Sequence, residues 1–102
     1  MKERKVEFAD SVLEDIDEIN AFLLSVMAEE SAVKYVSAMR DELLSLSFLA
    51  DCFQQSRSKQ LLRIHPQARR MVSHNRKWQY VFHIEDAFVV IDRILPAKML
   101  KE

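Results

Sequence analysis

The spacing of the apolar residues changes along the chain, and this change limits the possible folds more than any other feature. In the first half, large apolar residues recur every three or four positions, as they do on one face of a helix. In the last third they alternate or run together, and β-branched and aromatic types dominate, which is typical of strands. A chain with helices first and strands last predicts an α+β domain of two layers.

A short strand and a long helix are expected at the start of the chain. Residues 5–8 alternate polar and apolar side chains, as a strand with one buried face does. Ser11 followed by Glu14 is a capping-box signature for the start of a helix of about five turns. The apolar stripe of this helix consists of Val12, Leu13, Ile16, Ile19, Phe22, Leu23, Val26 and Met27.

A second helix is expected to begin at Glu29-Glu30-Ser31. Acidic residues stabilise the first turn of a helix, and Ser31 can cap it. The apolar stripe of the second helix consists of Val33, Val36, Met39, Leu43, Leu46, Leu49 and Ala50. Because the link between the two helices is short, we expect them to form an antiparallel hairpin.

The second half of the chain is expected to supply a loop and three strands. Residues 52–67 have no regular period and predict a loop, which Pro66 closes. Strands are expected at 68–74, 78–84 and 87–95, separated by short turns. They predict an antiparallel meander that forms one twisted sheet with the N-terminal strand. One sheet face then covers the helices, and the other faces solvent or a partner.

The turns of this chain must form without glycine, because the 102 residues include none. The register of the last hairpin therefore stays open, since a turn at Glu85-Asp86 lacks the residues that tight hairpins prefer. A chain of this length is typical of one domain, and we expect residues 1–102 to form a single one.

Charge is distributed very unevenly along the sequence. Residues 1–51 contain five Lys or Arg and twelve Asp or Glu, whereas residues 52–102 contain ten and four. No acidic residue occurs from Cys52 to Ile84. This asymmetry favours binding of an anionic partner or a polyanionic target. The alternative is a solvated basic surface whose charge is balanced by the acidic helices of the same domain.

Several classes of protein are disfavoured by what the sequence lacks. The single cysteine, Cys52, excludes an internal disulfide and is typical of a reducing compartment, so we expect a cytoplasmic protein. No apolar run is long enough for a membrane span, and residues 1–5 are not followed by the apolar region of a signal peptide. The spacing of three histidines and one cysteine does not suggest a metal site, and we expect no cofactor.

The order of elements and the C-terminal pattern together resemble the RelE/ParE superfamily of bacterial toxins along nearly the whole chain. The pattern is Arg70, then Trp78-Gln79-Tyr80-Val81-Phe82-His83-Ile84, then Glu85-Asp86, then Val89-Val90-Ile91-Asp92-Arg93-Ile94-Leu95. The resemblance implies a growth-inhibiting toxin of a type II toxin–antitoxin pair, a class that includes plasmid-stabilising systems. It also implies an antitoxin partner whose disordered, acidic amphipathic tail folds onto the toxin.

Two modes of action occur in this superfamily. RelE-like members cleave mRNA on the ribosome, and ParE-like members inhibit DNA gyrase. Two expected helices of about 17–20 residues favour the ParE-like branch, as does the lack of a tyrosine or histidine after the last strand. The chain departs from that branch where it has Pro96-Ala97-Lys98 in place of a histidine and paired arginines. An inactive member that only binds antitoxin is a third alternative, and a homodimer or a heterotetramer with antitoxin is left open.

The resemblance also implies candidate site residues for each mode. Cleavage of RNA without a metal needs a base, cations for the phosphate and an acid, and the candidates are Arg70, His74 and Lys98. The alternative for His74 is a polar position in the hairpin turn beside Asn75. For contact with a target or antitoxin, the candidates are Arg57, Arg63, Arg69, Arg76, Lys77, Val81, His83, Phe88 and Arg93.

Overall fold

The computed structural model describes residues 3–99. Its elements are β1 (Lys5–Phe8), α1 (Asp10–Val26), α2 (Glu29–Leu44), α3 (Leu46–Leu49), the 3-10 helix η1 (Ala50–Cys52), α4 (Lys59–Ile64), β2 (Arg69–Val72), β3 (Trp78–Glu85), β4 (Phe88–Pro96) and the 3-10 helix η2 (Ala97–Met99). The expected α+β class and the order of strand, two long helices and three strands are confirmed.

The four strands form one sheet in the order β1-β4-β3-β2. The three C-terminal strands make the expected antiparallel meander. β1, however, pairs in parallel with β4, so the sheet is mixed. A parallel pair needs a long crossover connection, and the helical hairpin is the first part of that connection.

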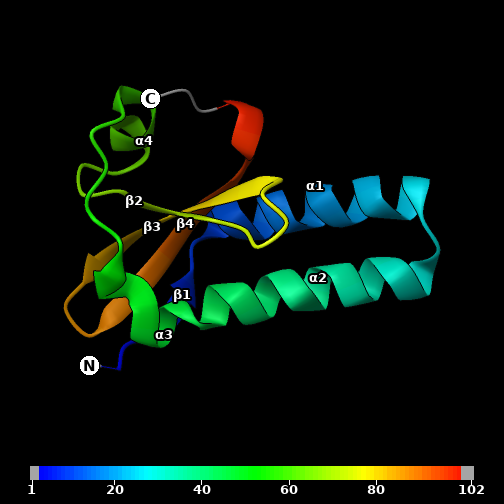
Figure 1. The fold of residues 1–102 in the computed structure, drawn as a ribbon, viewed down its shortest axis with the longest axis horizontal. Coiled ribbons are helices and arrows are strands. Elements are labelled where there is room, and N and C mark those ends of the chain that lie inside the picture. Colours follow the sequence, from blue (N-terminus) through cyan, green and yellow to red (C-terminus); the bar gives the residue numbers. More distant parts are fainter. Residues whose placement is uncertain (1–2, 100–102) are drawn as a thin grey trace.

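Helices α1 and α2 lie side by side in antiparallel directions and extend well beyond the sheet (Figure 1). Their inner sides pack on the sheet face that carries Tyr80, Phe82 and Ile91. The buried residues of this main core are Val12, Ile19, Leu23, Ala32, Met39, Leu43, Leu46, Ala50, Tyr80, Phe82, Val89, Ile91 and Ile94. The main core therefore combines residues of the helical first half of the chain with residues of the strands in the second half.

The helix starts and the end of α2 differ from the expectation. The N-cap residues are Ala9 and Ala28, both with extended backbone, and neither makes a side-chain cap hydrogen bond. Ser11 instead donates its hydroxyl to the carbonyl of Asp92 on β4, at 2.7 Å. The second helix is interrupted at Ser45, whose hydroxyl donates back to the carbonyl of Glu42, and α3 follows as a separate turn.

The sequence suggested that the second face of the sheet is open to solvent or a partner. This expectation was wrong, because the face is covered. Residues 52–67 do not form a plain loop, because α4 lies on this face and buries Leu61 and Ala68 against Val81. Ile64 and Leu95 pack around this smaller cluster. Without α4, the apolar side chains on this face of the sheet, such as Val81, would be exposed to water.

The two hairpin turns use left-handed backbone at residues other than glycine. Arg76 has φ of 62° in the β2–β3 turn, and Asp86 has φ of 52° in the β3–β4 turn. The pairing of Glu85 with Phe88 gives the second hairpin a two-residue turn at Asp86-Ala87, which fixes the register. In the first turn, the side-chain oxygen of Asn75 accepts the N–H of Lys77 at 3.0 Å.

Candidate functional site

A groove forms where the chain returns from the helices to the sheet. Phe53 packs edge-on against Phe82, with ring centroids 6.0 Å apart, and anchors the start of the returning segment. Gln55 then makes an isolated antiparallel bridge to Arg69 at the start of β2. The N–H of Ser56 donates to the carbonyl of Ala68 at 2.7 Å. These contacts hold residues 53–58 against the edge strand before α4 turns across the sheet.

The lining of this groove is polar and positively charged. It consists of Gln54, Gln55, Ser56, Arg57, Ser58, Lys59, Gln60 and Arg70, and we call it the basic groove. Its volume is about 810 Å³, and it opens widely to solvent. None of the lining residues is acidic, because the groove lies within the acid-free stretch of the sequence. The arrangement is suited to hold an extended anionic chain.

Arg70 connects the basic groove to the C-terminal end of the sheet. Its guanidinium donates to the side-chain oxygen of Gln79 at 3.1 Å. The side-chain nitrogen of Gln79 donates in turn to the carbonyl of Ala97 at 2.8 Å, beside Lys98. Gln79 thus connects Arg70, one candidate for RNA cleavage, to Ala97, the residue before the candidate Lys98.

His74 lies in the β2–β3 turn, where its exposed position fits the alternative of a polar turn residue. Its backbone N–H donates to the carboxylate of Glu42 on α2, at 3.2 and 3.3 Å to the two oxygens. Arg76 and Lys77 are exposed in the same turn. His74 thus contacts Glu42 through its backbone, whereas the Arg70 guanidinium contacts Gln79.

Three other candidate cations lie outside the basic groove. The Arg69 guanidinium donates to the carbonyl of Phe53 at 2.8 Å and holds the returning segment in place. Arg63 is exposed in the last turn of α4. Arg93 on β4 forms an ion pair with Asp15 on α1, at 2.8 Å.

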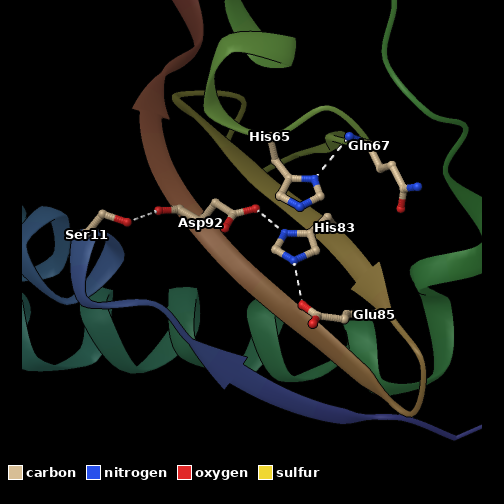
Figure 2. Close-up of polar contacts among 6 residues, drawn as sticks. All are labelled: Ser11, His65, Gln67, His83, Glu85 and Asp92. Carbon is tan, nitrogen blue, oxygen red and sulfur yellow. Dashed lines mark hydrogen bonds and ion pairs between the residues drawn. The ribbon is translucent and has the colours of Figure 1, made fainter.

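Two of the candidate contact residues on the strands are buried. Val81 is completely buried beneath α4, which corrects its expected role as an acceptor of apolar anchors. His83 does not line an open face, because only 5% of its surface is exposed. Its ring lies between Asp92 and Glu85, as Figure 2 shows. Phe88 is half-buried at the start of β4.

Buried polar residues of the helices were the main omission of the sequence analysis. Asp15 accepts hydrogen bonds from the Arg93 side chain and from the backbone N–H of Ile94. Its hydrogen bond to Arg93 is the main cause that raises the pKa of that guanidinium. A signal was present, since Asp15 is in phase with the buried residues Val12 and Ile19 rather than on the exposed face.

A second buried contact involves Tyr80, the only tyrosine of the last two strands. Its hydroxyl donates to the carboxylate of Glu42 at 2.9 Å. Burial, and next this hydrogen bond, raise the pKa of Tyr80 far above its usual value. The hydroxyl therefore stays protonated and serves as a structural donor inside the core.

The helical hairpin carries a different surface from that of the basic groove. A narrow apolar groove of about 180 Å³ runs between the helices, lined mainly by residues such as Ile16, Val36 and Met39. The exposed large apolar side chains of the hairpin are Leu13, Phe22, Leu24, Val26, Val33 and Leu44. The exposed carboxylates around them belong to Asp10, Glu14, Asp17, Glu18, Glu29, Glu30 and Asp41. We call this combination the acidic hairpin surface.

Metal sites and membrane-spanning helices are both absent from residues 3–99. No group of three or more His, Cys, Asp or Glu side chains there is arranged to hold a metal ion. No helix in that range has the length and apolar character needed to cross a membrane.

Comparison with known proteins identifies the fold. No protein-family model and no curated protein sequence matches the chain. Among solved structures, the chain is similar to one described as "Chromosomal ParDE TA system from P. aeruginosa". The TM-score is 0.77 at 17% sequence identity, and the match covers 91% of this chain and 95% of the other. The fold is ParE-like.

The ParE-like fold places both surfaces on one scaffold. The long hairpin that extends beyond the sheet carries the apolar and acidic groups. The segment between the helices and β2 carries the basic groove, at the sheet edge opposite β1. A partner that contacts both must present two stretches of different chemistry.

Proposed function

We propose that this protein is the toxin of a bacterial type II toxin–antitoxin pair, acting in the cytoplasm and neutralised by a cognate antitoxin. The observation that carries this proposal is the similarity to a chain of a ParDE system over nearly the full length of both chains. The resemblance of the C-terminal strand pattern to the RelE/ParE superfamily points the same way. Residues 1–102 act as one domain in this proposal.

The mode of action that we propose is inhibition of DNA gyrase by binding, as in the ParE-like branch. The lengths of α1 and α2, which are 17 and 16 residues, support this mode. The engagement of Tyr80 and His83 in buried contacts also supports it, because neither ring is positioned to meet a substrate from solvent.

A reconstituted supercoiling assay tests the gyrase target. Purified protein added in excess to gyrase and relaxed plasmid should reduce the rate of supercoiling, and the antitoxin should restore it. A heat-unfolded sample of the same protein is the control for unspecific effects. Unchanged supercoiling at excess of folded protein would remove gyrase as the target.

For the antitoxin, we propose contact with both surfaces described above. Apolar anchors of its tail dock between and beside α1 and α2, where Phe22 and Val33 are more than half exposed. Its acidic residues lie along the basic groove, next to Arg57 and Lys59. Coupled folding of this kind gains stability from apolar burial and uses charge for steering and register.

Binding kinetics with the product of an adjacent small gene separate these two contributions. The double substitution Arg57→Ala/Lys59→Ala should slow association at low salt and reduce its salt dependence. Phe22→Ala should mainly speed dissociation. Lys5→Ala, on the opposite sheet edge, is the matched control and should change neither rate. Wild-type rates in both groove and hairpin variants would refute this placement.

A second candidate function is ribosome-dependent cleavage of mRNA, which the basic groove favours. Arg57, Lys59 and Arg70 there provide cations for a phosphate backbone. Primer extension on mRNA after induction should then show cuts in phase with codons. Cleavage that persists at the wild-type level in an Arg70→Ala/His74→Ala variant would exclude these residues as the catalytic ones.

A further inference from the structure

The β2–β3 turn is fastened to α2 by side-chain hydrogen bonds, and Figure 1 shows it in yellow beside that helix. The hydroxyl of Tyr35 on α2 accepts the side-chain N–H groups of Asn75 and Trp78, each at 2.9 Å. One turn further along α2, the carboxylate of Glu42 accepts the backbone N–H of His74. The turn is therefore a fixed part of the protein surface.

Three exposed cationic residues lie in this turn or next to it. Arg76 and Lys77 belong to the turn itself. The N–H of Ala97 donates to the carbonyl of Lys77 at 2.9 Å, which brings the backbone of the next residue, Lys98, close to the turn. Residues 74–77 are all exposed and polar, and none of them is acidic.

Arg76 occupies a backbone position that suits glycine better than arginine. Its φ of 62° lies in the left-handed region, where a residue with a Cβ is less favourable. The turn is closed by the N–H of Arg76, which donates to the carbonyl of Ser73 at 2.9 Å, and by the side chains of Ser73 and Asn75. None of these bonds uses the Arg76 guanidinium, which is exposed. Closure of the turn thus does not explain the arginine, and retained backbone strain clusters at functional sites.

We propose that the β2–β3 turn binds the phosphate backbone of a nucleic acid, with Arg76 as the central contact and Lys77 and Lys98 beside it. A guanidinium pairs with a phosphate through two parallel N–H bonds. Residues 74–77 offer no apolar side chain, whereas a peptide that folds onto a partner gains most from apolar burial. The neighbouring carboxylate of Glu42 is occupied by donors from the turn and the core. The contact involves no cleavage and does not depend on the proposed toxin function.

Fluorescence anisotropy with the purified full chain tests this contact. The probes are a labelled duplex DNA and a labelled single-stranded RNA of equal length, and the more tightly bound probe identifies the kind of nucleic acid. Arg76→Gly should weaken binding about tenfold at about 0.1 M salt and reduce the slope of log affinity against log salt by about one, because one phosphate contact is lost. Glycine is favoured at this backbone position, so the loss would not reflect a damaged fold.

Arg76→Lys and Lys5→Ala are the matched controls. The first keeps a cation in the turn and should keep the salt slope. The second removes one cation from β1, at the opposite sheet edge, and should leave affinity and slope unchanged. Polyglutamate, a polyanion without phosphate, should displace the probe only weakly. The proposal is overturned if the wild type binds neither probe, if Arg76→Gly binds like the wild type, or if polyglutamate competes as well as unlabelled nucleic acid of equal charge.

Discussion

Asp15 joins the helical layer directly to the sheet. β1 ends at Phe8, so β4 has no strand partner on that side beyond Ile91. The carboxylate of Asp15 takes the place of the missing strand, since it accepts the backbone N–H of Ile94 at 2.9 Å and both contacts of Arg93. A buried backbone donor without such an acceptor would be costly.

Replacement of Asp15 by alanine should therefore destabilise the fold. We expect Asp15→Ala to lower the free energy of unfolding by about 2–3 kcal/mol, because the Ile94 N–H loses its acceptor and Arg93 its counterion. Chemical denaturation measures the change. Asp17→Ala, two positions along the same helix and exposed, is the control and should cost less than about 0.5 kcal/mol. Equal losses would contradict the role given to Asp15.

The Tyr80–Glu42 contact gives stability a dependence on alkaline pH. The folded state raises the pKa of Tyr80 above its unfolded value of about 10. The stabilisation is thus complete below about pH 10 and falls as the pH rises further, by up to about 1.4 kcal/mol per unit.

Tyr80→Phe should remove this part of the pH dependence. Its free energy of unfolding should start lower, by about 1 kcal/mol for the lost hydrogen bond, and then decline less steeply above about pH 10 than that of the wild type. Denaturation at a series of alkaline pH values measures both slopes. Parallel curves for the two proteins would show that Tyr80 does not keep its proton.

Among the elements, the turns show most clearly how a chain without glycine folds. Arg76 and Asp86 adopt left-handed backbone, which costs a residue with a Cβ about 1 kcal/mol relative to glycine. In the β2–β3 turn, side-chain hydrogen bonds offset this cost, since Asn75 binds both Ser73 and Lys77.

Glycine at the left-handed position should stabilise the protein. We expect Arg76→Gly to raise the free energy of unfolding by about 0.5–1 kcal/mol, because the strain at φ of 62° disappears. The neighbouring change Lys77→Gly should lower the free energy of unfolding. Lys77 has no left-handed backbone to relieve, and glycine loses more conformational entropy on folding. A thermal or chemical denaturation of both variants is sufficient. The opposite order of stabilities would contradict the strain assigned to Arg76.

The long helices and the strands were predictable from the sequence, whereas the short helices were not. The period of Val12, Ile19 and Leu23 indicates a helix over five turns without knowledge of its neighbours. α4 has only six residues, too few for a period to stand out, and it is stabilised by the burial of Leu61 against Val81. The expected cap at Ser11 was wrong because the helix begins one residue earlier, at Asp10, so that Ser11 lies inside its first turn; its hydroxyl donates to the Asp92 carbonyl.

On the scale of the whole molecule, the charge asymmetry of the sequence becomes a separation in space. The basic groove lies at the edge of the sheet beside β2, and the acidic hairpin surface lies on the helices. The sequence predicted the basic region but not which of its cations are engaged elsewhere. Arg69 and Arg93 bind partners outside the groove, whereas Arg57 and Arg70 belong to its lining, where Arg70 also binds Gln79; only the fold separates these roles.

The proposed function requires that the folded chain stops bacterial growth and that an antitoxin relieves this inhibition. The direct measurement is the colony count of a bacterial host after induction of this chain, with and without the product of the adjacent small gene. The account predicts a fall in colony count on induction and its recovery on co-expression. Unchanged colony counts while folded protein accumulates would contradict it.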